Sequence, residues 1–281
     1  MGPFFYKKLN DIPQKLTIKE EKIYIVGFPK SGNTWLVRMI AKILSYQVER
    51  EPMGGGGVDL AYLVNYESDS TSHGRVLKVH FMPENFLSEI DVIPQKIVYI
   101  SRDPKDVFIS SFFYFIAPDM QKEILLLSGN RIFKNPLKFI RHLNARRKLS
   151  KFLSVFSAEG IPGSGFRTVY EHKHEWERFL KGSEGIVYVF TTYENLLQDT
   201  TGEMKKIIIE LGFKNISSNR ISQVVTEESF DSLQKKAIKF HHLDSSFSRE
   251  YYTNFFRSGK AGDWKNYLTQ SQSKVLDYRR G

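Results

Sequence analysis

A lysine and two hydroxyl side chains lie in a glycine-flanked turn at residues 27–34, Gly-Phe-Pro-Lys-Ser-Gly-Asn-Thr. A β-rich run at residues 22–26 precedes this turn, and apolar residues with a helical period follow it over residues 34–45. Backbone N–H groups at the start of a helix have no partner within the helix and carry partial positive charge, so they bind anions well. Lys30 and the nearby hydroxyls add further donors. The turn therefore predicts a phosphate-type anion site.

The turn differs from the phosphate loop of nucleotide triphosphatases. Its two glycines, Gly27 and Gly32, have the right spacing, but Asn33-Thr34 stands where Lys-Ser/Thr is expected, and the lysine lies inside the turn. The pair that grips a magnesium-bound triphosphate is missing. A kinase-like phosphotransferase is kept as an alternative, together with a nucleotide-binding protein that uses the loop without chemistry.

A second pair of residues with catalytic potential is Lys78 and His80, at the end of a predicted strand over residues 76–79. The i, i+2 spacing puts both side chains on one face of a strand. Histidine has the ordinary pKa nearest to neutrality, which suits a general base. Because anion binding needs neither residue, the pair favours an enzyme over a binding protein.

The remaining elements place these residues in an α/β fold. Residues 96–101 and 185–190 read as strands, and residues 201–211 read as a helix. After the first of these strands, Asp103 suits an N-cap, Pro104 the first helical position and Asp106 the reciprocal capping position. Strands that alternate with helices predict a central, mostly parallel sheet flanked by helices, with a ligand at the carboxyl ends of the strands. We expect a single domain over residues 1–281.

Composition narrows the class of protein further. The 281 residues contain 41 Lys+Arg against 31 Asp+Glu, a formal net charge of +10, which favours an anionic ligand. With no cysteine in the chain, a disulfide scaffold, a cysteine-ligated metal site and a thiol nucleophile are excluded. Apolar runs are shorter than a membrane span, and the first residues do not have the order of a secretory signal. We expect a cytoplasmic protein.

A basic segment at residues 131–151 has eight Lys or Arg residues, no acidic residue and an apolar stripe. It predicts a basic amphipathic helix that binds a membrane surface, an acidic partner or RNA, or a solvated helix face that attracts an anionic cofactor. We favour the last of these, and expect no nucleic-acid or membrane partner.

Three windows, in the same order along the chain, resemble the signatures of the cytosolic sulfotransferases. Residues 28–35, Phe-Pro-Lys-Ser-Gly-Asn-Thr-Trp, resemble the 5′-phosphosulfate loop of these enzymes, which use 3′-phosphoadenosine 5′-phosphosulfate (PAPS). Residues 99–107, with Ser110 following, are similar to the strand and helix that bind the 3′-phosphate. Residues 257–266 resemble the third signature, which closes over the same phosphate. The resemblance implies a P-loop-like sulfotransferase fold.

The resemblance also implies roles for individual residues. His80 would take the proton of the acceptor, Lys78 and Lys30 would stabilise the transition state, and Ser110 would hold Lys30 until the acceptor arrives. The implied cofactor contacts are Lys30, Ser31, Gly32, Asn33, Thr34, Trp35, Arg102, Ser110, Tyr193, Ser229, Phe230, Arg257, Ser258 and Gly259. Two positions depart from the family pattern, since Asn33 and Glu228 stand where threonine is usual.

The implied reaction is transfer of a sulfuryl group from PAPS to a hydroxyl, or an amine, of a small-molecule acceptor. Its nucleotide product is adenosine 3′,5′-bisphosphate (PAP), and no metal is expected. The dimer motif of the family is altered at two positions, so a monomer or a weak homodimer is expected. His172 and Trp176 also fit a family pattern, and we interpret them as packing residues.

Overall fold

The structure is a computed structural model that describes residues 21–49, 74–90, 94–116, 136–243 and 256–277. Its elements group into two compact units. The first unit extends to Ser101 and includes His172–Ser229, and the second contains Arg102–Glu171 and the chain from Phe230 onward. The single domain expected over residues 1–281 stays a prediction.

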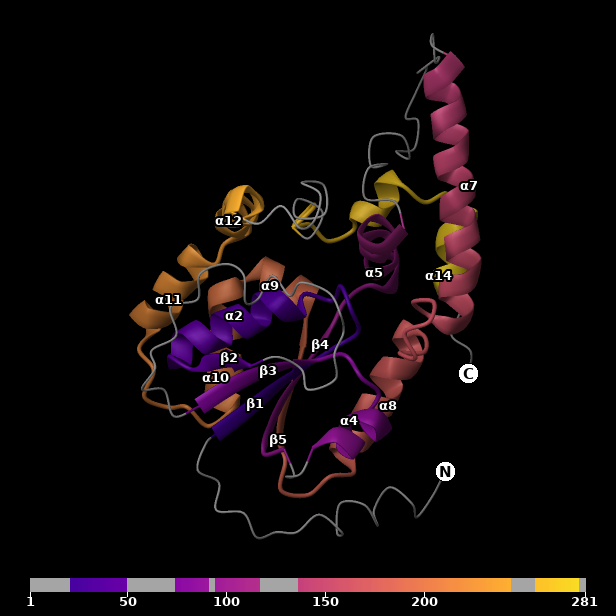
Figure 1. The fold of residues 1–281 in the computed structure, drawn as a ribbon. Coiled ribbons are helices and arrows are strands. Elements are labelled where there is room, and N and C mark those ends of the chain that lie inside the picture. The colour runs from indigo at the N-terminus through magenta and orange to yellow at the C-terminus, as the bar shows by residue number, and fades with distance from the viewer. Residues whose placement is uncertain (1–20, 50–73, 91–93, 117–135, 244–255, 278–281) are drawn as a thin grey trace. The chain divides into compact units, whose positions relative to one another are not determined.

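A five-stranded parallel sheet forms the centre of the first unit (Figure 1). Its strand order is β2-β3-β1-β4-β5. Strands β1 and β4 contain continuous buried runs, as expected for strands covered on both faces. The strands are β1 (Glu21–Val26), β2 (Gln47–Glu49), β3 (Gly74–Val79), β4 (Lys96–Ser101) and β5 (Val187–Thr192).

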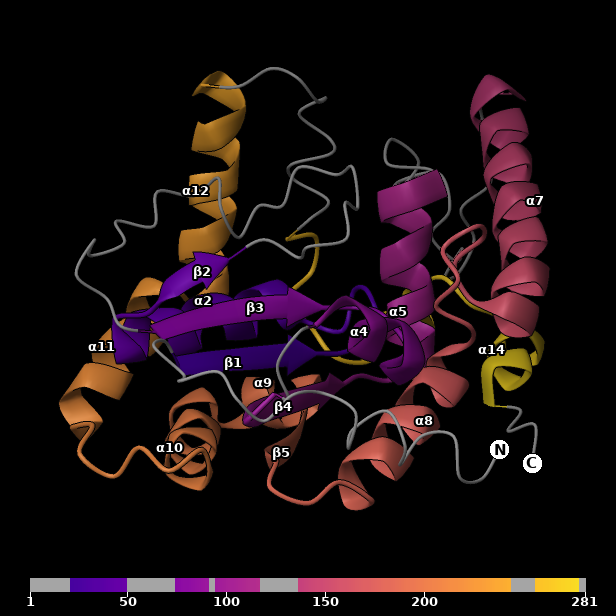
Figure 2. The same ribbon diagram turned by 60° about the horizontal axis from the view of Figure 1, so that its bottom comes forward.

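Helices cover both faces of this sheet, which confirms the predicted fold class (Figures 1 and 2). One face packs its apolar side chains against α2, α9, α10 and α11, and the other face packs against α4 and α8. These helices are α2 (Asn33–Leu44), α4 (Pro83–Glu89), α8 (Val169–Lys181), α9 (Tyr193–Gln198), α10 (Thr200–Glu210) and α11 (Ser218–Glu227).

The predicted functional residues follow the carboxyl ends of the strands. Gly27 follows β1, His80 follows β3, Arg102 follows β4 and Tyr193 follows β5. Strand β1 pairs with β3 on one side and with β4 on the other, so the strand order changes direction at β1. Open α/β sheets bind ligands at such a switch point, at the carboxyl ends of the strands.

The second unit is helical in its described part. The predicted cap at its first helix is confirmed, because the Asp103 carboxylate accepts a hydrogen bond from Lys105 N at 2.9 Å. The elements are α5 (Pro104–Ser111), the π-helix η1 (Phe112–Ile116), α7 (Pro136–Glu159), α12 (Phe230–Leu243), the 3-10 helix η2 (Asp263–Asn266) and α14 (Gln270–Asp277).

The reciprocal capping role predicted for Asp106 is wrong. Its buried carboxylate instead accepts hydrogen bonds from Gly262 N at 2.6 Å and Trp264 N at 3.0 Å, and so joins α5 to the start of η2. Burial raises the pKa of Asp106, against the opposing effects of the Arg102 charge and of the two N–H donors. The sequence pattern around α5 held no information about this long-range partner.

The basic segment forms a helix that is longer than predicted. Helix α7 spans 24 residues, whereas residues 131–135 of the predicted segment lie outside the described residues. Apolar side chains in its first turns are exposed, among them Leu137, Phe139 and Ile140. In the part of the chain that the structure describes, no helix is both long and apolar enough to span a membrane.

Candidate active site

The turn between β1 and α2 has the shape of an anion-binding loop. Ser31 N donates to Phe28 O at 3.1 Å, and Leu36 N donates to Gly32 O at 3.1 Å as the helix begins. Both Lys30 and Gly32 have positive φ, at 71° and 102°. Glycine is required at position 32, because a Cβ there would lie 2.8 Å from the ring of Tyr193. The N–H groups at the start of α2 are thus available to an anion.

The side chains of this loop fit a bound phosphosulfate. Ser31 is fully buried, and its hydroxyl has no hydrogen-bond partner among the described residues. Buried polar atoms are nearly always paired, so this hydroxyl fits a site where it donates to a bound anion. The Thr34 side chain lies in the first turn of α2 and is also buried. Both hydroxyls can donate to phosphate or sulfate oxygens.

His80 is tied to the same loop by its ring. Its Nδ1 atom lies 2.7 Å from the main-chain oxygen of Gly27. Because a carbonyl oxygen can only accept, Nδ1 must carry a proton, and in the neutral form of the ring the lone pair is then on Nε2. The ring is therefore held in the tautomer that a general base at Nε2 requires. Lys78 lies two residues earlier in β3, paired in register with Ile25.

The Asn33 side chain binds the main chain of the same loop. Its amide Nδ2 donates to Gly27 O at 3.2 Å, the oxygen that also accepts from His80. Its Oδ1 is buried without a partner among the described residues, and an acceptor atom is unsuited to phosphate oxygens. For Asn33, a contact with the cofactor through its main-chain N–H stays a prediction.

Two buried residues of α8 bind the main chain at His80. His172 Nε2 lies 3.0 Å from His80 O, and Trp176 Nε1 donates to Phe81 O at 2.9 Å. The sequence pattern predicts packing roles for both residues. The structure confirms their burial and adds hydrogen bonds that a residue pattern cannot show, because the partners are main-chain carbonyls 92 and 95 residues away.

Two of the cofactor contacts that the resemblance implies, Trp35 and Tyr193, lie together in the first unit. Their rings pack edge to face, with centroids 5.9 Å apart and an interplanar angle of 67°. The indole N–H of Trp35 donates to Glu228 O at 2.8 Å, which fixes the ring against the end of α11. Ser229 follows directly, and its N–H donates to Thr226 O at 3.3 Å.

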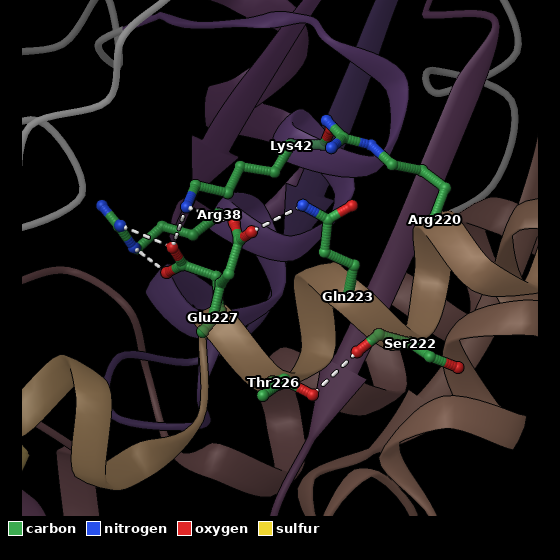
Figure 3. A network of polar contacts seen from close by, with 8 residues as sticks. Arg38, Lys42, Arg220, Ser222, Gln223, Thr226 and Glu227 are labelled. Atoms are coloured by element: carbon green, nitrogen blue, oxygen red, sulfur yellow. Dashed lines mark hydrogen bonds and ion pairs between the residues drawn. The ribbon is translucent and has the colours of Figure 1, made fainter.

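The carboxylate of Glu228 pairs with Arg38 and Lys42, two of the side chains labelled in Figure 3. It accepts from Arg38 Nε at 2.5 Å and from Arg38 Nη2 at 2.9 Å, and Lys42 lies at 2.7 Å. The side chains of Arg38 and Glu228 are both 0% exposed. Burial raises the pKa of Glu228, but the hydrogen bonds and charges of Arg38 and Lys42 outweigh this and lower it. Glutamate at this position thus binds α11 to α2.

The second unit brings Arg102 together with the third signature. Arg102 Nη2 donates to Lys260 O at 3.2 Å, so the loop of residues 257–262 lies against this guanidinium. Arg257 Nη1 donates to Tyr267 at 3.0 Å and pairs with Asp263 at 2.6 Å. Burial raises the pKa of Asp263, but the Arg257 charge and hydrogen bonds from three side chains, including Ser258, lower it overall.

The other predicted residues of the second unit lie at helix ends and in the same loop. Phe230 begins α12, and Gly259 packs on its ring so closely that a Cβ would lie 2.5 Å away. Gly259 also has a positive φ of 62°. Ser110 lies at the carboxyl end of α5. The structure thus gathers two groups of predicted residues, one around Gly27–Trp35 and one around Arg102.

Comparison with known proteins assigns the chain to a class. Residues 20–279 match the sulfotransferase domain family. The chain belongs to this family, and the predicted enzyme class, a PAPS-dependent sulfotransferase, is confirmed. Sulfotransferase 2A1 of Mus musculus is 26% identical over 284 residues, which cover 96% of this chain and 86% of the relative. The 3-beta-hydroxysteroid sulfotransferase of Cavia porcellus is 25% identical over 288 residues, covering 99% and 88%.

Solved structures share the fold at lower identity. Mouse sulfotransferase SULT7A1 complexed with PAP is 22% identical, with a TM-score of 0.59, and the match covers 97% of this chain and 86% of that one. Retinol dehydratase in complex with retinol and PAP is 18% identical, with a TM-score of 0.54 and coverage of 97% and 83%. These matches confirm the P-loop-like sulfotransferase fold.

Proposed function

We propose that the chain transfers a sulfuryl group from PAPS to a hydroxyl, or an amine, of a small-molecule acceptor. The observation that carries the proposal is the bond between His80 Nδ1 and Gly27 O at 2.7 Å. In the neutral ring this bond places the proton on Nδ1 and the lone pair on Nε2, on a residue that is tied to the anion loop. Relatives named for hydroxysteroids, and solved structures with PAP, support the same chemistry.

The loop residues would hold the 5′ end of the cofactor. The main-chain N–H groups at the start of α2 and the Ser31 and Thr34 hydroxyls donate to its oxygens, while Trp35 and Tyr193 offer apolar faces to adenine. Arg102, with Ser110 and residues 257–259, would bind the 3′-phosphate, for which a guanidinium can supply two parallel donors. PAPS, when bound, supplies the sulfuryl group and leaves as PAP.

The chemistry of the chain's own residues is proton removal and charge stabilisation. His80 Nε2 takes the proton of the acceptor, a role that contributes about 10²–10⁴-fold to a rate. Lys78 and Lys30 carry fixed positive charge, which stabilises negative charge that grows on the transferred group and on the departing phosphate. We also propose that Ser110 holds Lys30 until the acceptor binds. The step requires no metal.

Thermal melting with nucleotides tests the cofactor assignment. Without metal, PAP should raise the melting temperature more than adenosine 5′-monophosphate, because only PAP reaches the donors of the 3′ site. ATP with magnesium should raise it less than PAP. A larger effect of ATP with magnesium would point to the kinase-like alternative, and no effect of PAP on well-folded protein would remove the cofactor.

Radiolabelled PAPS and a set of acceptors test the reaction itself. The set should contain phenols, hydroxysteroids, retinol and aromatic amines, so that both oxygen and nitrogen acceptors are present. Labelled product from at least one of them, with one PAP released per transfer, is expected. Tight PAP binding without transfer to any acceptor would instead support a non-catalytic nucleotide-binding protein.

A further inference from the structure

His172 contacts the main chain that carries the proposed base. Its Nε2 atom lies 3.0 Å from His80 O, directly after the end of β3. The next carbonyl, at Phe81, accepts from Trp176 Nε1 at 2.9 Å. Both α8 side chains are 0% exposed. Buried side-chain donors therefore fix two successive carbonyls directly after β3. The main chain of a loop is usually less restrained than this.

The proton positions around His172 follow from its partners. His80 O can only accept, so Nε2 of His172 must carry the proton, and Nδ1 then accepts from the Tyr99 hydroxyl at 3.0 Å. Burial lowers the pKa of His172 to about 4 and raises that of Tyr99 well above its ordinary value. At neutral pH the imidazole is uncharged and the phenol is protonated, so both hydrogen bonds have one fixed direction.

The ring of His172 also packs on the anion loop. It meets Phe28 edge to face, with centroids 5.8 Å apart and an interplanar angle of 88°. Phe28 is the neighbour of Gly27, whose carbonyl accepts the hydrogen bond from His80 Nδ1. The buried His172 side chain therefore contacts both residues' surroundings: it binds His80 O, and it packs on Phe28 beside Gly27.

We propose that His172 is a positioning residue, which holds the His80 main chain and the Phe28 ring so that Nδ1 of His80 stays on Gly27 O. It fixes the direction and the tautomer of the base without touching the reacting atoms. The proposal rests on His80 as the base in the proposed function. It assigns to a buried histidine a role that apolar packing alone would not require.

Nitrogen-15 NMR of the histidine rings tests the proposal without any acceptor. The His80 signal is assigned by its loss in His80→Gln. In the native protein we expect His80 with a proton on Nδ1 that exchanges slowly with solvent. In His172→Met, which keeps the bulk and removes both ring nitrogens, that proton should exchange about tenfold faster or more, as for a lost buried hydrogen bond.

Matched variants separate positioning from packing. His174→Met changes an exposed histidine two residues further along α8 and should leave the His80 signal as in the native protein. His172→Gln keeps an amide donor for His80 O and should restore part of the protection. If His172→Met does not fold, Tyr99→Phe decides, because it keeps the ring and removes only the hydroxyl that donates to Nδ1.

The outcomes distinguish this proposal from the proposed function. An unchanged His80 proton in folded His172→Met, or in Tyr99→Phe where the former does not fold, overturns the positioning role even if His80 is the base. Transfer that persists in His80→Ala overturns the assignment of His80 as the base, independently of the results for His172. PAP affinity should change less than about twofold in His172→Met, because His172 is not among the residues proposed to bind the nucleotide.

Discussion

His80 and Asn33 donate to one oxygen atom, the carbonyl of Gly27, at 2.7 Å and 3.2 Å. A carbonyl has two lone pairs, so both bonds can form together. The residue that begins the anion-binding helix is thereby joined to the proposed base through a single main-chain atom. Substitutions of Asn33 should consequently affect His80 as well as the cofactor loop.

Substitutions at Asn33 separate these two effects. Asn33→Leu removes the amide that donates to Gly27 O without adding charge. The transfer rate should therefore fall about 10-fold, while PAP affinity stays close to native. Asn33→Asp adds a negative charge beside the anion loop and should weaken PAP binding by at least about tenfold. Calorimetry with PAP measures the second effect, and steady-state transfer measures the first. Equal PAP affinity in both variants would place residue 33 outside the anion site.

Gly32 should not tolerate a side chain. In Gly32→Ala the new Cβ would lie 2.8 Å from the Tyr193 ring at a φ of 102°, and such overpacking costs about 1–3 kcal/mol. The matched control is Gly163→Ala, which has a positive φ of 71° but nothing within 4 Å of the new Cβ. Urea unfolding should therefore show a larger loss for Gly32→Ala. Equal losses would mean that backbone conformation alone matters at position 32.

Glu228 should matter far more to stability than its neighbour Glu227. In Glu228→Gln the buried Arg38 loses its charged partner, a change that typically costs about 3–5 kcal/mol. Glu227 is 42% exposed and lies 3.3 Å from Lys42, so Glu227→Gln should cost about 0–1 kcal/mol. Chemical denaturation of both variants checks the difference. A similar small cost for both would show that the Arg38 pair does not hold α11 to α2.

Acid should destabilise the protein through His172. Burial lowers its folded pKa to about 4 from an ordinary 6.5, so the unfolded chain binds the proton more tightly. This contribution to stability is complete above pH 6.5, falls as the pH drops from 6.5 toward 4, and amounts to about 3 kcal/mol at most. His172→Gln should flatten the pH dependence of unfolding in that window. A native-like slope in the variant would assign the acid loss to other groups.

The sequence predicted the parallel sheet and the residues at its carboxyl ends because those features depend on local pattern. The sequence itself contains the β-rich run before Gly27, the helical period of apolar residues after it, and the N-cap residue Asp103. The strand expected at residues 185–190 begins two residues later, at Val187, whose N–H donates to Gln95 O at 2.8 Å. Gly185 has a positive φ of 77° and belongs to the preceding turn.

What the sequence could not show are partners far along the chain. The Asp106 bonds to Gly262 and Trp264 span more than 150 residues. In the sequence, Glu228 is only a departure from the threonine that is usual there, and its pairing with Arg38 requires α2 and α11 to be in contact. Asn33 is named as a cofactor contact only because the loop resembles the phosphosulfate loop of the family, whereas the bond of its amide to the Gly27 carbonyl is seen only in the structure.

The central claim is that His80 removes the acceptor proton, whereas cofactor binding by the loop does not need His80. The variant His80→Ala tests this claim most directly. Calorimetry with PAP and transfer from radiolabelled PAPS should be measured on the same folded preparation. We predict PAP affinity within about twofold of native and transfer reduced by about 10²–10⁴-fold. Transfer at the native rate with PAP still bound would contradict the account.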